Sequence, residues 1–143
     1  MSYKITVRVF QTNPNAHFRV VEETIFNYAN GGTWSRVNDE LVLQMGGSGT
    51  SGTLRFQSDT NEDFIVALGI HNYKRWGDIV TNLSNSETGV IIHPQYYSAA
   101  TKIGKRRESQ LASYSVKNAK GRQFAINYIV AEGNDLKVNI IIG

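Results

Sequence analysis

Short stretches rich in β-branched and aromatic residues recur along the first half of this chain, about every ten residues. Turn-forming residues such as Asn13-Pro14-Asn15 and Asn38-Asp39 separate them. Strands at this spacing favour a sandwich or barrel over alternating strands and helices. The first two stretches are expected to pair as a hairpin with an irregular connection. The predicted strands cover residues 4–10, 18–28, 33–37, 41–45, 53–57 and 64–70.

The pattern changes after residue 73. Residues 78–83 carry apolar side chains at helical spacing behind Asp78, a candidate N-cap, and therefore predict a short helix. Residues 108–114 are a second helix candidate, and Val90-Ile91-Ile92 is expected to form a strand that ends at His93-Pro94. Further strands are predicted at 114–118, 124–130 and 136–142, so the chain is expected to be mainly β.

Length and composition indicate one domain that spans residues 1–143. The hydrophobic fraction of 41% and the charged fraction of 19% are those of an ordinary soluble protein. Because the chain has no cysteine and only three widely separated histidines, we expect neither a metal centre nor a cofactor. The N-terminus alternates polar and apolar residues and lacks the apolar core of a signal peptide, which indicates a cytosolic protein.

Positive charge is concentrated in the second half of the chain. Residues 1–71 carry 5 basic and 7 acidic side chains, whereas residues 72–143 carry 10 basic and 5 acidic ones. Much of the excess lies in the cluster from Lys102 to Arg107. Such a cluster is typical of a surface that meets nucleic acid or an anionic membrane, but also of a solvated turn at the start of a helix. The modest net charge of +3 favours the second interpretation, so nucleic acid is not an expected partner.

Residues 46–53 form a cluster of glycine and small hydroxyl residues between two predicted strands. The segment Gly47 to Gly52 matches the G-x-G-x-x-G spacing of dinucleotide sites, but the next residues predict a strand instead of the helix that would receive a pyrophosphate. Two interpretations stay open: a glycine-rich turn, or a place where a ligand approaches bare backbone. Ser48 lacks the G-x-S-x-G context of a hydrolase nucleophile, and the acidic residues are scattered, so no enzyme is expected.

The segment His71-Asn72-Tyr73-Lys74-Arg75-Trp76 combines two aromatic rings, an amide, an imidazole and two cations at the end of an apolar strand. Loops of this composition often bind ligands, and the mixture suits a sugar, whose hydroxyls need directional hydrogen bonds and whose C–H faces stack on rings. The alternative is that Tyr73 and Trp76 are core or interface residues.

Three segments resemble the fungal fruit-body lectin family: Tyr28 to Trp34, Gly46 to Gly52, and His71 to Trp76. The resemblance covers nearly the whole chain. It implies an actinoporin-like β-sandwich of two sheets joined by a helix-loop-helix. It also implies a cytosolic, usually tetrameric lectin that binds glycans of glycoproteins or glycolipids and serves in fungal defence.

The resemblance further implies two sugar sites in each subunit. One site takes Galβ1-3GalNAc (the T-antigen) or GalNAc. The other takes terminal GlcNAc, and its binding residues are expected to include an arginine near residue 102. The chain has Lys102 or Ile103 at that place, and because a lysine lacks the planar fork of an arginine, GlcNAc binding is expected to be weakened. The galactose-type positions are Ala29, Ser48, Gly49, His71 and Asn72; the GlcNAc-type positions are Asp78, Ile79, Thr81, Lys102 and Tyr114.

The actinoporin-like shape raises one alternative function, that of a membrane-acting protein. Actinoporins insert an amphipathic N-terminal helix, whereas residues 1–10 of this chain predict a strand. The sequence therefore favours a lectin that does not insert into membranes.

Overall fold

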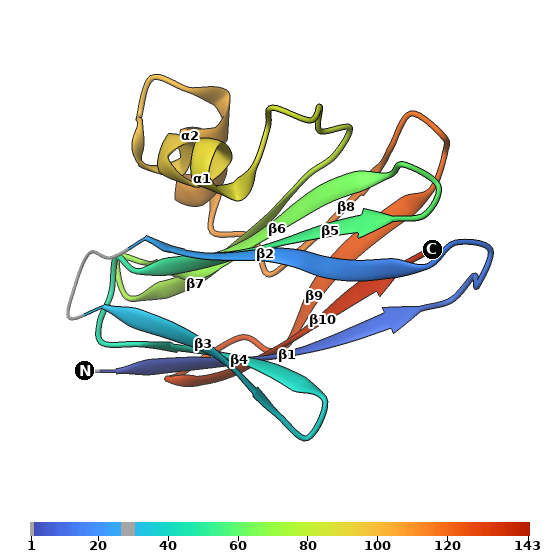
Figure 1. Cartoon of the computed structure of the whole chain (residues 1–143). Coiled ribbons are helices and arrows are strands. Elements are labelled where there is room, and N and C mark those ends of the chain that lie inside the picture. Colours follow the sequence, from blue (N-terminus) through green and yellow to red (C-terminus); the bar gives the residue numbers. More distant parts are fainter. Residues whose placement is uncertain (1, 27–30) are drawn as a thin grey trace.

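The computed structural model describes residues 2–26 and 31–143, which form two packed β-sheets with helices on one side (Figure 1). The six-stranded sheet has the order β3-β4-β1-β10-β9-β8, and the four-stranded sheet the order β2-β5-β6-β7. The strands are β1 Tyr3–Gln11, β2 Phe18–Phe26, β3 Gly32–Val37, β4 Glu40–Met45, β5 Ser51–Ser58, β6 Asp63–His71, β7 Lys74–Val80, β8 Ser113–Lys117, β9 Gln123–Val130 and β10 Asp135–Ile142. The helical segments are α1 Gly89–Ile92, the 3-10 helix η1 His93–Tyr97 and α2 Lys102–Ser109. The predicted sandwich, whose two sheets are joined along the chain by a helix-loop-helix, is confirmed.

The main core fills the space between the two sheets. Ile5 and Val7 of β1 point into it and are at most 1% exposed, whereas Thr6 between them is partly exposed. Phe18 of β2 makes edge contacts with Phe64 of β6 and Phe124 of β9, with ring centroids 5.8 and 5.9 Å apart. Since β6 and β9 belong to different sheets, this aromatic cluster packs the two sheets together. Its members are inward-facing residues of the alternating pattern that the sequence shows.

A smaller second core lies between the four-stranded sheet and the helices. Ile65, Ala67 and Trp76 of the sheet contact Ile92 and Tyr96 of the helical segment. Figure 1 shows the helices over the face of this sheet that points away from the six-stranded sheet. Both faces of the four-stranded sheet are therefore covered, which explains why β6 and β7 are buried along most of their length. No helix in the described ranges is long and apolar enough to span a membrane.

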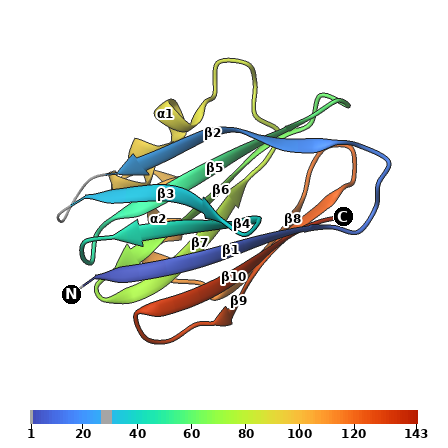
Figure 2. The same ribbon diagram turned by 60° about the horizontal axis from the view of Figure 1, so that its bottom comes forward.

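The predicted hairpin of residues 4–10 and 18–28 is wrong. Strand β1 lies in the middle of the six-stranded sheet, antiparallel to β4 and parallel to β10 (Figure 2), whereas β2 pairs with β5 at the edge of the other sheet. Both strands carry inward apolar residues, and each strand packs them from its own sheet into the core between the sheets. Residues 12–17 cross from one sheet to the other, and Gln11 supports this crossing by donating its side-chain amide to the carbonyls of Asn13 and Ala16, at 2.8 and 2.6 Å.

The helix predicted at residues 78–83 is also wrong, because Asp78, Ile79 and Val80 end strand β7. A strand covered on both faces buries successive residues, so the two-residue alternation that marks a half-exposed strand is missing. The second helix candidate, 108–114, is displaced: α2 ends at Ser109, and β8 begins at Ser113.

The strand predicted at Val90-Ile91-Ile92 belongs instead to α1 and is a further error. The Glu22 carboxylate of β2 accepts hydrogen bonds from the Gly89 and Val90 N–H groups at 2.6 and 3.3 Å. The first N–H groups of a helix have no partner within the helix, so an anion that accepts from them stabilises its first turn. The β-branched residues of this segment alone predict a strand, because they do not reveal this contact.

Candidate functional site

The glycine-rich loop between β4 and β5 lies against the turn between β6 and β7. The Tyr73 N–H donates to the Ser48 Oγ at 2.9 Å, and the Gly49 N–H donates to the Ile70 carbonyl at 2.8 Å. The fold therefore brings Ser48 and Gly49 next to His71 and Asn72. Ala29, the fifth galactose-type position, lies outside the described residues.

The β6–β7 turn presents its side chains to solvent. Asn72 and Tyr73 have φ angles of 48° and 64°, the left-handed conformation of a tight hairpin turn, which an asparagine adopts readily. Tyr73 is 79% exposed, whereas Trp76, three residues further along, is fully buried in the second core. Of the two interpretations of these aromatics, the core role thus applies to Trp76 and the surface role to Tyr73.

Two glycines of the glycine cluster, Gly49 in the loop and Gly52 at the start of β5, are required for different reasons. Gly49 has a φ of 100°, which few other residues adopt. At Gly52 a Cβ atom would come within 2.8 Å of the Trp34 ring, which packs flat against this position. The glycine cluster therefore meets a packing requirement at Gly52 and a backbone requirement at Gly49.

A buried polar network supports the loop from behind. The His93 imidazole contacts the Thr24 Oγ1 at 2.8 Å and the Ser51 Oγ at 2.7 Å, and the Tyr97 hydroxyl donates to the Gly49 carbonyl at 2.8 Å. His93 is 2% exposed, and this burial lowers its pKa to about 4. A neutral imidazole therefore holds the strand that follows the loop, in a position closed to ligands.

The second group of predicted positions surrounds a single pocket beside α2. Its cavity volume is about 260 Å³. All five GlcNAc-type positions line it, together with Arg106 and three apolar side chains. The carboxyl group of Asp78 lies at the inner end, where it accepts a hydrogen bond from the Tyr96 hydroxyl at 2.7 Å. Burial raises the pKa of Asp78, while the Tyr96 hydroxyl and the Arg106 guanidinium oppose this rise.

The family resemblance led us to expect an arginine near residue 102, and Arg106 places a guanidinium in the same pocket. Its Nη1 lies 3.3 Å from the Asp78 Oδ1, and its guanidinium carbon lies 4.8 Å from the centre of the Tyr114 ring. Sequence reasoning missed this residue. The available signal was helical spacing, since Lys102 and Arg106 are four residues apart and so lie on the same face of a helix.

Two of the four basic side chains in the cluster from Lys102 to Arg107 make contacts within the protein. Arg106 pairs with Asp78, and Arg107 donates from Nε to the Tyr96 carbonyl at 2.7 Å. Lys102 and Lys105 are exposed. With both arginines directed at the protein, the cluster is the body of helix α2, which favours the structural interpretation over a polyanion-binding surface.

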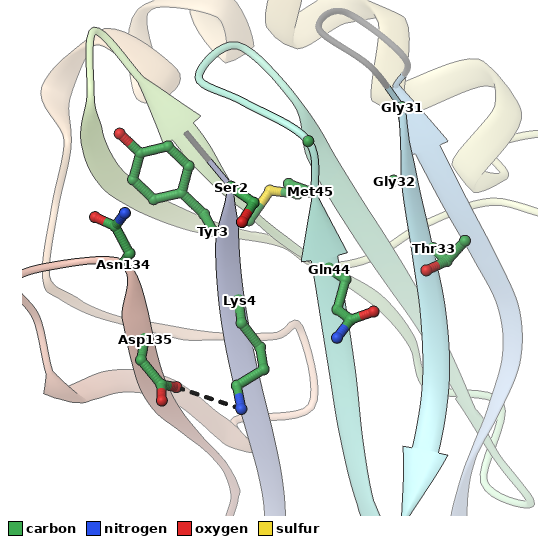
Figure 3. Close-up of a pocket in the computed structure, with 11 residues that line it drawn as sticks. Ser2, Tyr3, Lys4, Gly31, Gly32, Thr33, Gln44, Met45, Asn134 and Asp135 are labelled. Atoms are coloured by element: carbon green, nitrogen blue, oxygen red, sulfur yellow. Dashed lines mark ion pairs between the residues drawn. The ribbon is translucent and has the colours of Figure 1, made fainter.

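A wider hollow of about 790 Å³ opens at the outer end of the six-stranded sheet (Figure 3). It contains the exposed ion pair between Lys4 and Asp135, at 3.7 Å, and it touches the glycine-rich loop only at Gly46. Within the described parts of the chain, the lining of this hollow contains none of the predicted sugar-binding residues. The hollow is therefore separate from both groups of residues described above.

Comparison with known proteins identifies close relatives over the full length of the chain. The family model described as "Fungal fruit body lectin" matches residues 1–140. The lectin of Boletus edulis is 53% identical over 142 residues, which cover 99% of each chain. The crystal structure of the wild-type Xerocomus chrysenteron lectin superposes with a TM-score of 0.96 at 51% identity and covers 100% of both chains. A mutated form of that lectin gives the same TM-score at 52% identity, over 100% of this chain and 99% of the other.

Proposed function

Because the chain belongs to the fungal fruit body lectin family and is therefore a carbohydrate-binding lectin, we propose that it binds two kinds of sugar at two sites. The first site, at Ser48, Gly49, His71 and Asn72, takes Galβ1-3GalNAc or GalNAc. The second, the pocket beside α2, takes terminal GlcNAc. The observation that carries the proposal is the gathering of residues far apart in the sequence into two compact groups.

At the galactose-type site, binding proceeds without covalent chemistry. The Ser48 Oγ accepts a hydrogen bond from the Tyr73 N–H, which leaves its own O–H to donate to a sugar hydroxyl. The Asn72 amide stands beside it on the exposed turn, and Gly49 lets a sugar ring lie close to the backbone. Each such hydrogen bond contributes about 0.5–1.5 kcal/mol, so single-site dissociation constants are expected to be micromolar to millimolar.

At the GlcNAc-type site, the pocket offers both hydrogen-bond acceptors and hydrogen-bond donors. The Thr81 hydroxyl and the Asp78 carboxylate supply acceptors, while Arg106 supplies a planar donor at the same wall. Ile79 and the Tyr114 ring give apolar surface for the sugar C–H groups and the acetamide methyl. Since Arg106 stands in this pocket, the weakening expected from Lys102 no longer follows, and we propose GlcNAc binding of ordinary strength for such a site.

Weak sites become useful when several subunits present them to one surface. We propose a homotetramer that crosslinks glycans of glycoproteins or glycolipids, located in the cytosol and active in defence. Phe10 of β1 and Ile129 of β9 support self-association, because they expose 46% and 53% of their surface on the outer face of the six-stranded sheet. Linked binding then raises avidity by factors of about a hundred or more.

Strand β1 counts against the membrane-acting alternative. Residues 4–7 pair with β4 on one side and with β10 on the other, and residues 8–11 pair with β10. Releasing them as an amphipathic helix would break the middle of the six-stranded sheet, so no feature of the described residues favours insertion.

Two single substitutions test the proposal site by site. Asn72→Ala should weaken Galβ1-3GalNAc binding about tenfold and leave GlcNAc binding unchanged, because one or two hydrogen bonds are lost at one site only. Thr81→Val should show the reverse pattern. Titration calorimetry with each sugar measures both affinities, and a glycan array with and without free GlcNAc tests whether the sites are separate. Unchanged binding of Galβ1-3GalNAc by Asn72→Ala would refute the assignment of the first site.

A further inference from the structure

The His71 ring lies between an arginine and the asparagine of the galactose-type site. Its Nδ1 is 2.6 Å from the Arg107 Nη1, and its Nε2 is 3.4 Å from the side-chain amide of Asn72. Arg107 is fixed in turn by the Tyr96 carbonyl, at 2.7 Å, and by the Tyr97 ring, whose centre lies 4.8 Å from the guanidinium carbon. A rigid arginine on helix α2 therefore reaches the sugar site through one imidazole.

The contacts of His71 with Arg107 and Asn72 determine which ring nitrogen of His71 carries the proton. A guanidinium group only donates hydrogen bonds, so the Nδ1 of His71 has to accept with its lone pair. The neutral ring then carries its proton on Nε2, which becomes a donor. A donor at Nε2 requires an acceptor opposite, and the side chain of Asn72 offers its amide oxygen after a half-turn of the amide group. With the oxygen on the ring, the NH₂ group of Asn72 faces away from His71.

We propose that Arg107 is a positioning residue of the galactose-type site, which fixes the Nε2–H tautomer of His71 and thereby presents the Asn72 amide to the sugar as a hydrogen-bond donor. The inference rests on the proposed function of this site. It defines the chemistry that Asn72 recognises: an acceptor on the sugar, such as a hydroxyl oxygen or the acetamide carbonyl of GalNAc.

The backbone of the same turn is held by the same part of the helical segment. The Gln110 side chain, directly after α2, donates to the His71 carbonyl, and the Gln110 carbonyl accepts from the Arg75 Nη1 at 2.8 Å. Side chain and main chain of His71 are thus both fixed from the C-terminal end of α2. This double support matters because an exposed turn would otherwise lose entropy on binding a sugar.

Several charges surround the His71 ring. Burial and the positive charge of Arg107 lower its pKa, Glu108 raises it, and Lys74 faces His71 across the hairpin. Protonation would remove the acceptor at Nδ1 and place a cation against Arg107. Galactose-type binding is therefore expected to fall on acidification, with a midpoint below the ordinary pKa of histidine, about 6.5.

The proton arrangement is measured directly by nitrogen NMR of the imidazole side chains of the wild-type protein, with His71 assigned from the spectrum of His71→Gln. We expect an unprotonated Nδ1 and a protonated Nε2. This measurement needs no sugar and no arginine variant. A proton on Nδ1 in the neutral wild-type ring would overturn the inference.

The orientation of the amide is tested by Asn72→Asp at about pH 7.5, where His71 is neutral. An aspartate keeps the acceptor that faces Nε2 and tolerates the left-handed turn, but it lacks the NH₂ donor. The variant should therefore lose as much affinity for GalNAc as Asn72→Ala. If Asn72→Asp retained wild-type affinity, the amide oxygen would be the group that meets the sugar, and the proposal would be wrong.

The role of Arg107 is tested by Arg107→Met, with Lys105→Met as the control on the exposed face of the same helix. Arg107→Met should weaken GalNAc binding about three- to tenfold, shift the His71 tautomer, and raise the pH midpoint, with GlcNAc binding unchanged. Arg107→Lys, which keeps the charge and one donor, should recover part of the loss and serves if Arg107→Met does not fold. Wild-type tautomer and affinity in both variants would overturn the proposal. Absence of GalNAc binding by the wild type would instead refute the proposed function and the sugar-binding role, while the imidazole spectrum would still decide the proton arrangement.

Discussion

Acidification should destabilise this protein through His93 before it affects the carboxylates. His93 is 2% exposed and bonded to two hydroxyl groups, and its pKa falls to about 4 from an ordinary value of 6.5. A lowered pKa means that the unfolded chain takes up the proton first, so stability is complete above about pH 6.5 and is lost as the pH falls towards 4. With 1.36 kcal/mol for each pKa unit, the loss is about 2 kcal/mol at pH 5 and about 3 kcal/mol at pH 4.

Urea unfolding of the wild type and of His93→Gln, at one protein concentration and at several pH values, isolates this effect. Glutamine keeps one donor and one acceptor in the network but does not titrate, so the variant should lose less stability than the wild type by these amounts. All other ionisable groups are the same in both proteins, so their contributions cancel from the difference. The reasoning would be refuted if the free energy of unfolding depended on pH in the same way in both proteins, or if the measured pKa of His93 were near 6.5.

Three further predictions concern the two sites and their support. Gly52→Ala should cost about 1–3 kcal/mol in urea unfolding, because the new Cβ meets the Trp34 ring at 2.8 Å; a stability equal to the wild type would show that the ring moves freely. Tyr97→Phe should cost about 1–3 kcal/mol by leaving the Gly49 carbonyl without its donor, and should weaken GalNAc more than GlcNAc binding in calorimetry. Arg106→Met should weaken GlcNAc binding about tenfold and spare GalNAc binding; equal affinities would mean that Lys102 or another group recognises this sugar.

Strand positions were predictable where one face of a strand meets the core and the other meets solvent. Strand β1 shows this alternation, and its predicted range agrees with Tyr3–Gln11. Its partner was not predictable, because inward apolar residues fit equally well next to β2 or opposite it. Strand β7 was not predicted, for the opposite reason. Both of its faces are covered, so its sequence lacks the alternation of polar and apolar residues by which a strand is predicted.

The candidate sites were predictable only as far as the family resemblance named their positions. Residue patterns alone marked the glycine cluster and the segment 71–76 as candidates, without a ligand. Neither route found Arg106 or Arg107, because their roles depend on which way helix α2 faces, and the sequence interpretation placed the helix after them. Adjacent side chains of a helix point about 100° apart, so neighbours can serve different sites.

The parallel pairing of β1 with β10 has a consequence for the order of folding. Strands β5, β6 and β7 join successive neighbours through short turns, so the four-stranded sheet can begin to form from local contacts. In the middle of the six-stranded sheet, by contrast, Lys4 pairs with Asp135. Closing so long a loop is slow, because the chain loses entropy before the stabilising contacts between the strands form. During synthesis, β1 therefore exposes a strand edge until residues 135–142 leave the ribosome, and a chain stalled before that point offers this edge to other chains.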